Sequence, residues 1–407
     1  MDKNLLQRLE RHIEIQNSAE YHDIRSQRLS SRLIETINNN LKERPRAVVS
    51  LGCSFAQGQA AYDDEILNFL RPIGGGSCSD FNYAYKNHDL KDLLDFAEYF
   101  KLSIIPKSQD DEQWYNQSPG NYEVVTGEIE IANSFVNKFA ELSDYVPINL
   151  GNLGNGNTSS INRLFTYPID WHLCDEVLIL WCYTDLNRFD LVNDTGLDYH
   201  QIGNDHKTMW PQADFYDPSR EKFHQGINWH NTQYYWTRTA WSEVYNYINF
   251  VTAGIKLNTW CKSHDAKLIT FGAFNKINRK IVEHEYCYGN IIRDKTHEII
   301  ENFDNPKHQT IMDYNIRSLD LFPWHTMYEP GEEETFFDLA LAQDLKHEDF
   351  SEYCKNKIGK TENINMWDVI NMSGTPRDWI FACGHPSAKA HDLLAQNLFK
   401  HYQEVYL

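Results

Sequence analysis

Apolar residues along the chain follow two spacings in turn, which predicts strands separated by helices. Short runs rich in β-branched residues are typical of buried strands, whereas apolar positions three and four apart are typical of helices. Strands are expected at 47–51, 145–150, 176–181 and 267–271, with a fifth near 366–370. Helices are expected at 128–142, 159–166 and 240–261, with a closing helix at 386–402. This alternation predicts a parallel sheet that is covered by helices on both faces.

The first 45 residues have a pattern of their own. Leucine and isoleucine recur at helical spacing in two stretches, so we expect an N-terminal helical arm over 1–45 that serves in packing or oligomer contact. One α/β domain is then expected over 46–407. Long insertions are expected to interrupt it at about 70–125, 186–236 and 274–350. Loops of such length usually form lids, subdomains or contact surfaces.

The stretch 47–58, AVVSLGCSFAQG, is the most informative part of the sequence. Its apolar run ends at Gly52, Ser54 follows, and Gly58 comes four positions later. A turn from strand to helix presents its side chain at the carboxyl edge of a sheet, where nucleophiles are commonly found. Ser54 is therefore a candidate nucleophile. A serine that only caps the next helix is the alternative.

A histidine lies in a similar position near the other end of the chain. In the segment 384–387, GHPS, proline suits the first helical position and Ser387 suits the cap, so His385 should lie on the connection into the last helix. Parallel strands would bring this connection to the same edge as Ser54. His385 is therefore a candidate general base, and a structural histidine is the alternative.

Four segments resemble the sequence blocks of the SGNH (GDSL-like) hydrolases. They are 52–58 (GCSFAQG), 149–154 (NLGNLG), 177–185 (VLILWCYTD) and 385–386 (HP). Their order and spacing agree with the family. The chain departs from it at Cys53 in place of Asp, Cys182 in place of Gly and Thr184 in place of Asn. Ala382 and Cys383 stand where the catalytic acid is expected.

The resemblance implies a flavodoxin-like three-layer α/β/α sandwich with a parallel sheet of about five strands. It also implies a serine esterase or O-deacylase that acts on a small ester or an acylated glycan. The implied oxyanion hole consists of the backbone N–H groups of Ser54 and Gly154 and the side chain of Thr184. Because a threonine hydroxyl is shorter than an amide, Asn155 is a substitute donor, and Asn157 and Asn187 are further alternatives.

The catalytic acid is the least determined part of this interpretation. Asp378, seven residues before His385, is the nearest carboxylate in sequence, and Asp185 is a second choice. Two alternatives need no acid: a backbone carbonyl orients His385, or Ser54 and His385 act as a pair alone. The competing hypothesis is a catalytically degenerate domain that serves in binding or assembly, for example in a virion, because similar divergent sequences occur in phage-encoded proteins.

Composition limits the binding partners and the cellular location that we expect for the protein. The net charge of −20 argues against nucleic acid and against anionic membranes. The eight cysteines contain no C-x-x-C pair, and neither they nor the histidines match a metal signature, so reduced thiols and no metal or cofactor are expected. With no signal peptide or membrane-length apolar run, we expect a cytoplasmic protein, with a virion as the alternative. Aromatic residues concentrated in 186–236 would suit stacking on sugars or an ordinary subdomain core.

Overall fold

The computed structural model describes most of the predicted α/β core. The described residues are 4, 7–8, 31–63, 66, 90–100, 103–106, 122–125, 127–152, 156–186, 189–192, 206–209, 243–283, 316–328, 335–359, 364, 368, 378–380 and 384–407. Most of the first helix predicted for the N-terminal arm and most of the three predicted insertions lie outside these residues; residues 4, 7 and 8 of that helix are described and are helical. Among the described helices, none combines the length and the apolar character needed to cross a membrane.

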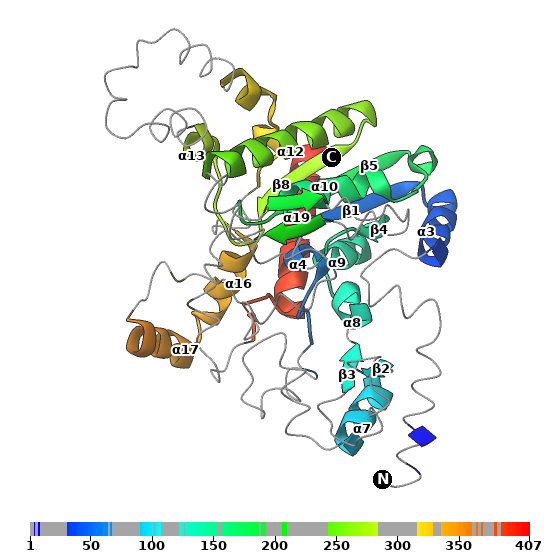
Figure 1. Cartoon of the computed structure of the whole chain (residues 1–407), viewed down its shortest axis with the longest axis vertical. Coiled ribbons are helices and arrows are strands. Elements are labelled where there is room, and N and C mark those ends of the chain that lie inside the picture. The colour runs from blue at the N-terminus through cyan, green and yellow to red at the C-terminus, as the bar shows by residue number, and fades with distance from the viewer. Residues whose placement is uncertain are drawn as a thin grey trace.

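A parallel four-stranded sheet forms the centre of the molecule (Figure 1). Its strands are β1 (Arg46–Gly52), β4 (Val146–Asn149), β5 (Glu176–Tyr183) and β8 (Lys267–Gly272), in the order β4-β1-β5-β8. The four principal predicted strands are therefore confirmed. The sheet has four described strands rather than about five. The fifth prediction, near 366–370, lies outside the described residues except for Asp368, which is helical.

Two single bridges border the far edge of β8. Met327 forms a parallel bridge with Thr270, and Thr335 forms one with Gly272. The hydroxyl groups of Thr270 and Thr326 are also 3.0 Å apart. The chain around 327 and 335 thus covers part of this edge without a regular strand.

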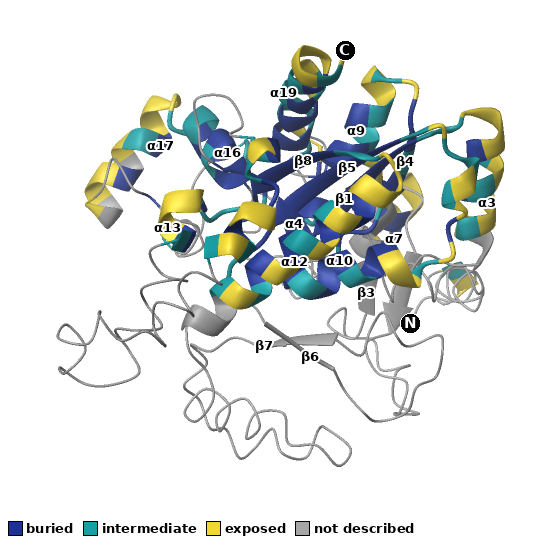
Figure 2. Ribbon diagram, turned by 90° about the horizontal axis from the view of Figure 1, so that it is seen from above, coloured by how far each residue is buried: buried dark blue, intermediate teal, exposed yellow. Residues whose placement is uncertain are grey.

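Helices cover both faces of the sheet, as the sequence predicts (Figure 2). One face packs against α9 (Phe135–Leu142), α16 (Phe336–Asp344) and α19 (Ala388–Tyr406). The other packs against α3 (Ser31–Glu43), α10 (Asn157–Thr166) and α12 (Glu243–Ser263). Successive strand residues point to opposite faces, so Val48 enters the first core and Val49 the second. A sheet buried on both faces explains the continuous apolar runs.

The helix predicted at 128–142 is divided into two. It consists of α8 (Gly127–Ala132) and α9, which are separated by Asn133 and Ser134. The Ser134 hydroxyl donates to the Ile131 carbonyl at 2.6 Å, and Ser134 occupies the N-cap position of α9. The serine therefore ends one helix and begins the next, which is a break that apolar spacing alone does not predict.

The remaining described elements are short. The helical ones are α4 (Ser54–Gln57), α7 (Leu90–Phe100), η3 (Trp171–Leu173), α13 (Arg279–Glu283), η7 (Trp324–Thr326), α17 (Glu348–Tyr353) and the π-helical η8 (Cys354–Ile358). Two antiparallel pairs, β2 (Ser103–Pro106) with β3 (Tyr122–Val125) and β6 (Phe189–Val192) with β7 (His206–Met209), lie within or beside the predicted insertions.

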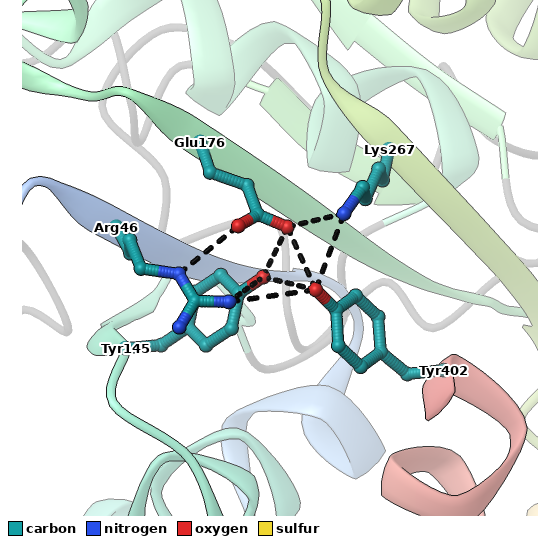
Figure 3. Close-up of polar contacts among 5 residues, drawn as sticks. All are labelled: Arg46, Tyr145, Glu176, Lys267 and Tyr402. Carbon is teal, nitrogen blue, oxygen red and sulfur yellow. Dashed lines mark hydrogen bonds and ion pairs between the residues drawn. The ribbon is translucent and has the colours of Figure 1, made fainter. Parts of the chain in front are cut away.

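A polar cluster closes the amino-terminal end of the sheet (Figure 3). We call it the amino-end cluster; it consists of Arg46, Tyr145, Glu176, Lys267 and Tyr402. The Glu176 carboxylate forms ion pairs with Arg46 at 3.0 Å and with Lys267, and it accepts hydrogen bonds from both tyrosine hydroxyls. Burial alone would raise the pKa of Glu176, but these hydrogen bonds outweigh it and lower the pKa to about 2.

Candidate active site

Ser54 begins a short helix directly beyond the carboxyl end of β1. Gly52 has a φ of +152°, and a Cβ there would lie 2.4 Å from the carbonyl oxygen of Cys182 on β5. Gly58, with φ of +96°, ends α4, and a Cβ there would lie 2.5 Å from the Glu130 carbonyl. Both glycines are thus required by close backbone contacts, and together they set the turn that holds Ser54.

The structure brings Ser54 and His385 together although they are 331 positions apart. Ser54 Oγ lies 2.7 Å from His385 Nε2. With His385 in the tautomer that carries its proton on Nδ1, the serine hydroxyl donates to Nε2. This is the contact that a nucleophile needs with its base, so the predicted juxtaposition of the two residues is confirmed.

Aromatic packing fixes the imidazole in this position. The Phe55 ring lies 4.9 Å from the His385 ring, centroid to centroid, at an angle of 43°. Phe55 in turn contacts Phe274 and Phe336, at 5.3 and 6.1 Å. Ser54 itself is only 4 % exposed. The pair therefore lies at the border of the apolar core, where an unbonded hydroxyl would be costly.

The second sequence block supports the Ser54 turn from the side. The Asn149 amide donates to the carbonyl of Gln57, the last residue of α4, at 3.0 Å and accepts from the Ser50 hydroxyl and the Gly151 N–H. A Cβ on Gly151 would lie 2.3 Å from the Gln57 nitrogen. Sequence reasoning gave these two residues no such role. Gly154 and Asn155, the predicted oxyanion donors of this block, lie outside the described residues.

Thr184 lies beyond the carboxyl end of β5 and is fully buried. Its N–H donates to Asn157 Oδ1 at 2.9 Å, and Asn157 Nδ2 donates back to its carbonyl at 3.1 Å. The Thr184 hydroxyl has no hydrogen-bond partner among the described residues. Asn157 was an alternative oxyanion donor, and its amide is instead bound to this backbone. Asn187, the other alternative, lies outside the described residues.

Asp378 lies on a short antiparallel ribbon that carries His385. Ile380 bridges Pro386, and the Ser387 N–H donates to the Trp379 carbonyl at 2.8 Å. In this register Trp379 pairs with Ser387, and the Asp378 carbonyl accepts the Ser387 hydroxyl, so Asp378 lies opposite the residues that follow His385 rather than opposite His385 itself. The role of Asp378 as the orienting acid therefore stays a prediction, as does that of its alternative, Asp185, which follows Thr184.

The same ribbon corrects the expected cap of the last helix. Ser387 stands at the N-cap position of α19, but its hydroxyl forms no cap bond. It donates instead to the Asp378 carbonyl at 2.7 Å. The serine thus joins the two strands of the ribbon instead of capping the helix.

A buried carboxylate that the sequence did not single out anchors this ribbon. Asp344 is fully buried at the end of α16 and accepts the backbone N–H groups of Asp378, Trp379 and Ile380 at 3.0, 3.1 and 2.9 Å. No motif surrounds Asp344 in the sequence. Only its place at the end of an apolar helical pattern distinguishes it.

A second histidine, His391, lies behind the Ser54–His385 pair, and the sequence did not indicate a role for it. It is fully buried on α19, and its Nδ1 accepts the N–H of Phe135, the first residue of α9, at 3.1 Å. Burial, together with the nearby His385, lowers the pKa of His391 to about 3. A neutral imidazole that accepts through Nδ1 ties the two helices together.

Cys182 is fully buried near the end of β5, and Cys53 is fully buried at the N-cap of α4, directly after β1. Burial raises the pKa of Cys182 well above its ordinary value, and nearby Cys53 adds to this effect. Cys383 lies outside the described residues. Within the described part of the chain, no three His, Cys, Asp or Glu side chains come together as a metal site. Cys182 thus has the properties of an inert core residue.

Comparison with known proteins returns no match among protein-family models, curated proteins or solved structures.

Proposed function

We propose that the protein is a serine ester hydrolase of SGNH-like type, with Ser54 as nucleophile and His385 as general base. The single observation that supports this most strongly is the 2.7 Å contact between Ser54 Oγ and His385 Nε2. Burial of Ser54 and the rings around His385 keep the pair aligned. The arrangement of Ser54 and His385, and not the fold alone, therefore supports the proposed function.

The position of the pair in the sheet supports the proposal independently. In chain order, the four parallel strands are arranged 2-1-3-4, which agrees with the first four strands of a flavodoxin-like sheet. The order in which strands are added to the sheet reverses between β1 and β5. Ligands of such sheets bind outside the carboxyl ends of the strands at this point. Ser54 follows β1 and Thr184 follows β5.

The proposed reaction proceeds through an acyl-enzyme. Ser54 Oγ attacks the ester carbonyl carbon while its proton passes to His385 Nε2, and the carbonyl electrons move to the oxygen. Collapse of this tetrahedral species breaks the bond to the leaving alkoxide, which takes the proton from His385. Water then attacks the acyl-serine with the same base, which releases the acid and restores Ser54.

The oxyanion would be bound at the carboxyl ends of β1, β4 and β5, the first three strands of the parallel sheet in chain order. The Ser54 N–H lies in the first turn of α4, where N–H groups have no acceptor within the helix. The Thr184 hydroxyl, without a partner among the described residues, is a second donor. Gly154 and Asn155 complete the proposed set. A small ester or an acylated carbohydrate is the proposed substrate class.

A non-catalytic binding or structural role is the second candidate. It is favoured by the complete burial of Thr184 and by the replacement of the expected acid at Ala382. Such a protein would retain the fold and bind an ester or glycan without hydrolysing it.

Hydrolysis of p-nitrophenyl acetate separates the two candidates. We expect turnover by the natural chain, return to the background rate in Ser54→Ala, and a fall of about 100- to 10,000-fold in His385→Ala. Ser160→Ala, which removes a buried hydroxyl that donates to the Gly156 carbonyl, is the matched control and should retain activity. Equal rates in the natural chain and Ser54→Ala would favour the binding role.

A further inference from the structure

Asp344 occupies a rigid position at the carboxyl edge of the sheet. The helix that carries it, α16, is capped at its N-terminus by Thr335, which bridges Gly272 at the end of β8. The Phe337 N–H also donates to the Ala273 carbonyl at 2.9 Å. A helix fixed at its start to the edge strand holds its last residue in a defined place. Asp344 is therefore anchored to the sheet itself.

The carboxylate of Asp344 binds three backbone N–H groups. Its Oδ1 accepts the N–H groups of Asp378 and Trp379, and its Oδ2 accepts that of Ile380. Three converging N–H donors can stabilise a buried charge, and they fix the conformation of the three residues that donate them. The segment 378–380 thus has its orientation set by one side chain.

This segment in turn fixes the backbone beside His385. Ile380 bridges Pro386, and Ser387 binds both the Trp379 carbonyl, through its N–H, and the Asp378 carbonyl, through its hydroxyl. Gly384, with φ of +80°, precedes the base on its other side. His385 therefore lies between a left-handed glycine and two residues that are paired with the segment held by Asp344.

We propose that Asp344 is a positioning residue for His385, acting through the backbone of 378–380 and 386–387. This inference rests on the proposed function and extends it. In the resembling family an acid close to the base orients it, and that position is held here by Ala382 and Cys383. Asp344, about 40 residues earlier in the chain, supplies a carboxylate that fixes the base loop by another route.

The test compares Asp344→Asn with Asp338→Asn in the full-length chain. Asparagine preserves shape but turns one acceptor oxygen into a donor that faces a backbone N–H. Asp338 lies on the same helix and accepts from the Thr335 hydroxyl at 2.6 Å, so its substitution perturbs α16 without touching the ribbon. We expect kcat on p-nitrophenyl acetate to fall about 10- to 100-fold in Asp344→Asn. The KM should change by less than about threefold, and Asp338→Asn should retain the natural kcat.

A second readout does not depend on activity. The imidazole of His385 is followed by NMR through a pH titration in the natural chain and both variants. We expect Asp344→Asn alone to change its chemical shifts and titration midpoint. Natural kcat and natural His385 signals in Asp344→Asn would overturn the inference. Altered His385 signals together with no esterase activity in the natural chain would refute the proposed function and leave the positioning role standing.

If Asp344→Asn does not fold, Ser387→Ala provides a second test of the ribbon. This variant removes only the bond from the hydroxyl to the Asp378 carbonyl, on the other strand of the same ribbon. We expect a smaller change of the same kind in the His385 signals. Unchanged signals in a folded Ser387→Ala would overturn the inference.

Discussion

Polar side chains at the two ends of the parallel sheet differ in how completely they are hydrogen-bonded. At the amino end, the amino-end cluster pairs its charges and hydroxyl groups with one another (Figure 3). At the carboxyl end, Thr184 Oγ1, Gln57 Oε1 and His391 Nε2 are buried without a hydrogen-bond partner among the described residues. An unsatisfied buried group costs about 1–3 kcal/mol, so these three groups lower the stability of the fold at the carboxyl end.

We therefore expect the main effects on activity at the carboxyl end of the sheet and the main effects on stability at the amino end. Substitutions at the carboxyl end should change catalysis far more than they change the free energy of unfolding. Substitutions in the amino-end cluster should do the reverse.

The largest effect on activity should come from the base. His385→Ala removes the acceptor of the Ser54 proton, so kcat/KM should fall about 100- to 10,000-fold. The variant should stay folded, with a loss of about 1–2 kcal/mol in urea unfolding, because the buried Ser54 hydroxyl loses its hydrogen-bond partner while His385 itself is only half-buried. A variant that unfolds and loses activity in parallel would contradict the division between the two ends.

The buried hydroxyl of Thr184 should matter for rate and not for stability. Thr184→Val keeps the shape of the side chain and removes the proposed oxyanion donor, so kcat should fall about 100- to 1,000-fold. Because the hydroxyl has no partner among the described residues, unfolding should cost the same or more free energy than in the natural chain. An unchanged kcat would exclude Thr184 from the oxyanion hole.

Glu176→Gln should give the opposite result. It leaves Arg46 and Lys267 without their carboxylate, and we expect a loss of about 2 kcal/mol of stability at pH 7 because the cluster is partly exposed. Activity at that pH should be retained. Glu141→Gln, at an exposed i,i+3 pair with Lys138, is the control and should change stability by less than about 0.5 kcal/mol.

The pH dependence of stability follows from the lowered pKa of Glu176. A carboxyl whose pKa falls from 4.5 to about 2 on folding contributes stability that is fully present above pH 4.5. That contribution is lost as the pH falls from 4.5 towards 2. Glu176→Gln should lack this slope in urea unfolding followed over the same range, and an equal slope in both chains would contradict the assignment.

The smallest expected effect is that of Asp378→Asn. The register of the ribbon sets Asp378 away from the level of His385, so kcat should fall by less than about tenfold. A fall near 10,000-fold, as loss of an orienting acid produces, would restore Asp378 as the third member of a triad.

The sequence predicted those parts of the molecule that depend on local pattern. The four strands follow from short apolar runs, and the meeting of Ser54 with His385 follows from two connections at the carboxyl ends of parallel strands. The Ser54 turn was predictable because Gly52 and Gly58 leave a clear signal in the chain.

The parts that the sequence could not predict depend on contacts between distant residues. Glu176 meets Lys267 only because of the register between β5 and β8, and Asp344 meets the 378–380 backbone only because of where α16 ends. No local spacing encodes either contact. The break at Ser134 and the bond from Ser387 to Asp378 were missed because a serine hydroxyl has several acceptors within reach.

Labelling with a fluorophosphonate tests the Ser54–His385 unit most directly. The reagent forms a covalent adduct with a serine only where a base activates it, and mass spectrometry of peptides locates that adduct. We expect a single adduct on Ser54 in the natural chain and little or none in His385→Ala. An adduct on another residue, or an unreactive Ser54 in the folded natural chain, would contradict the account.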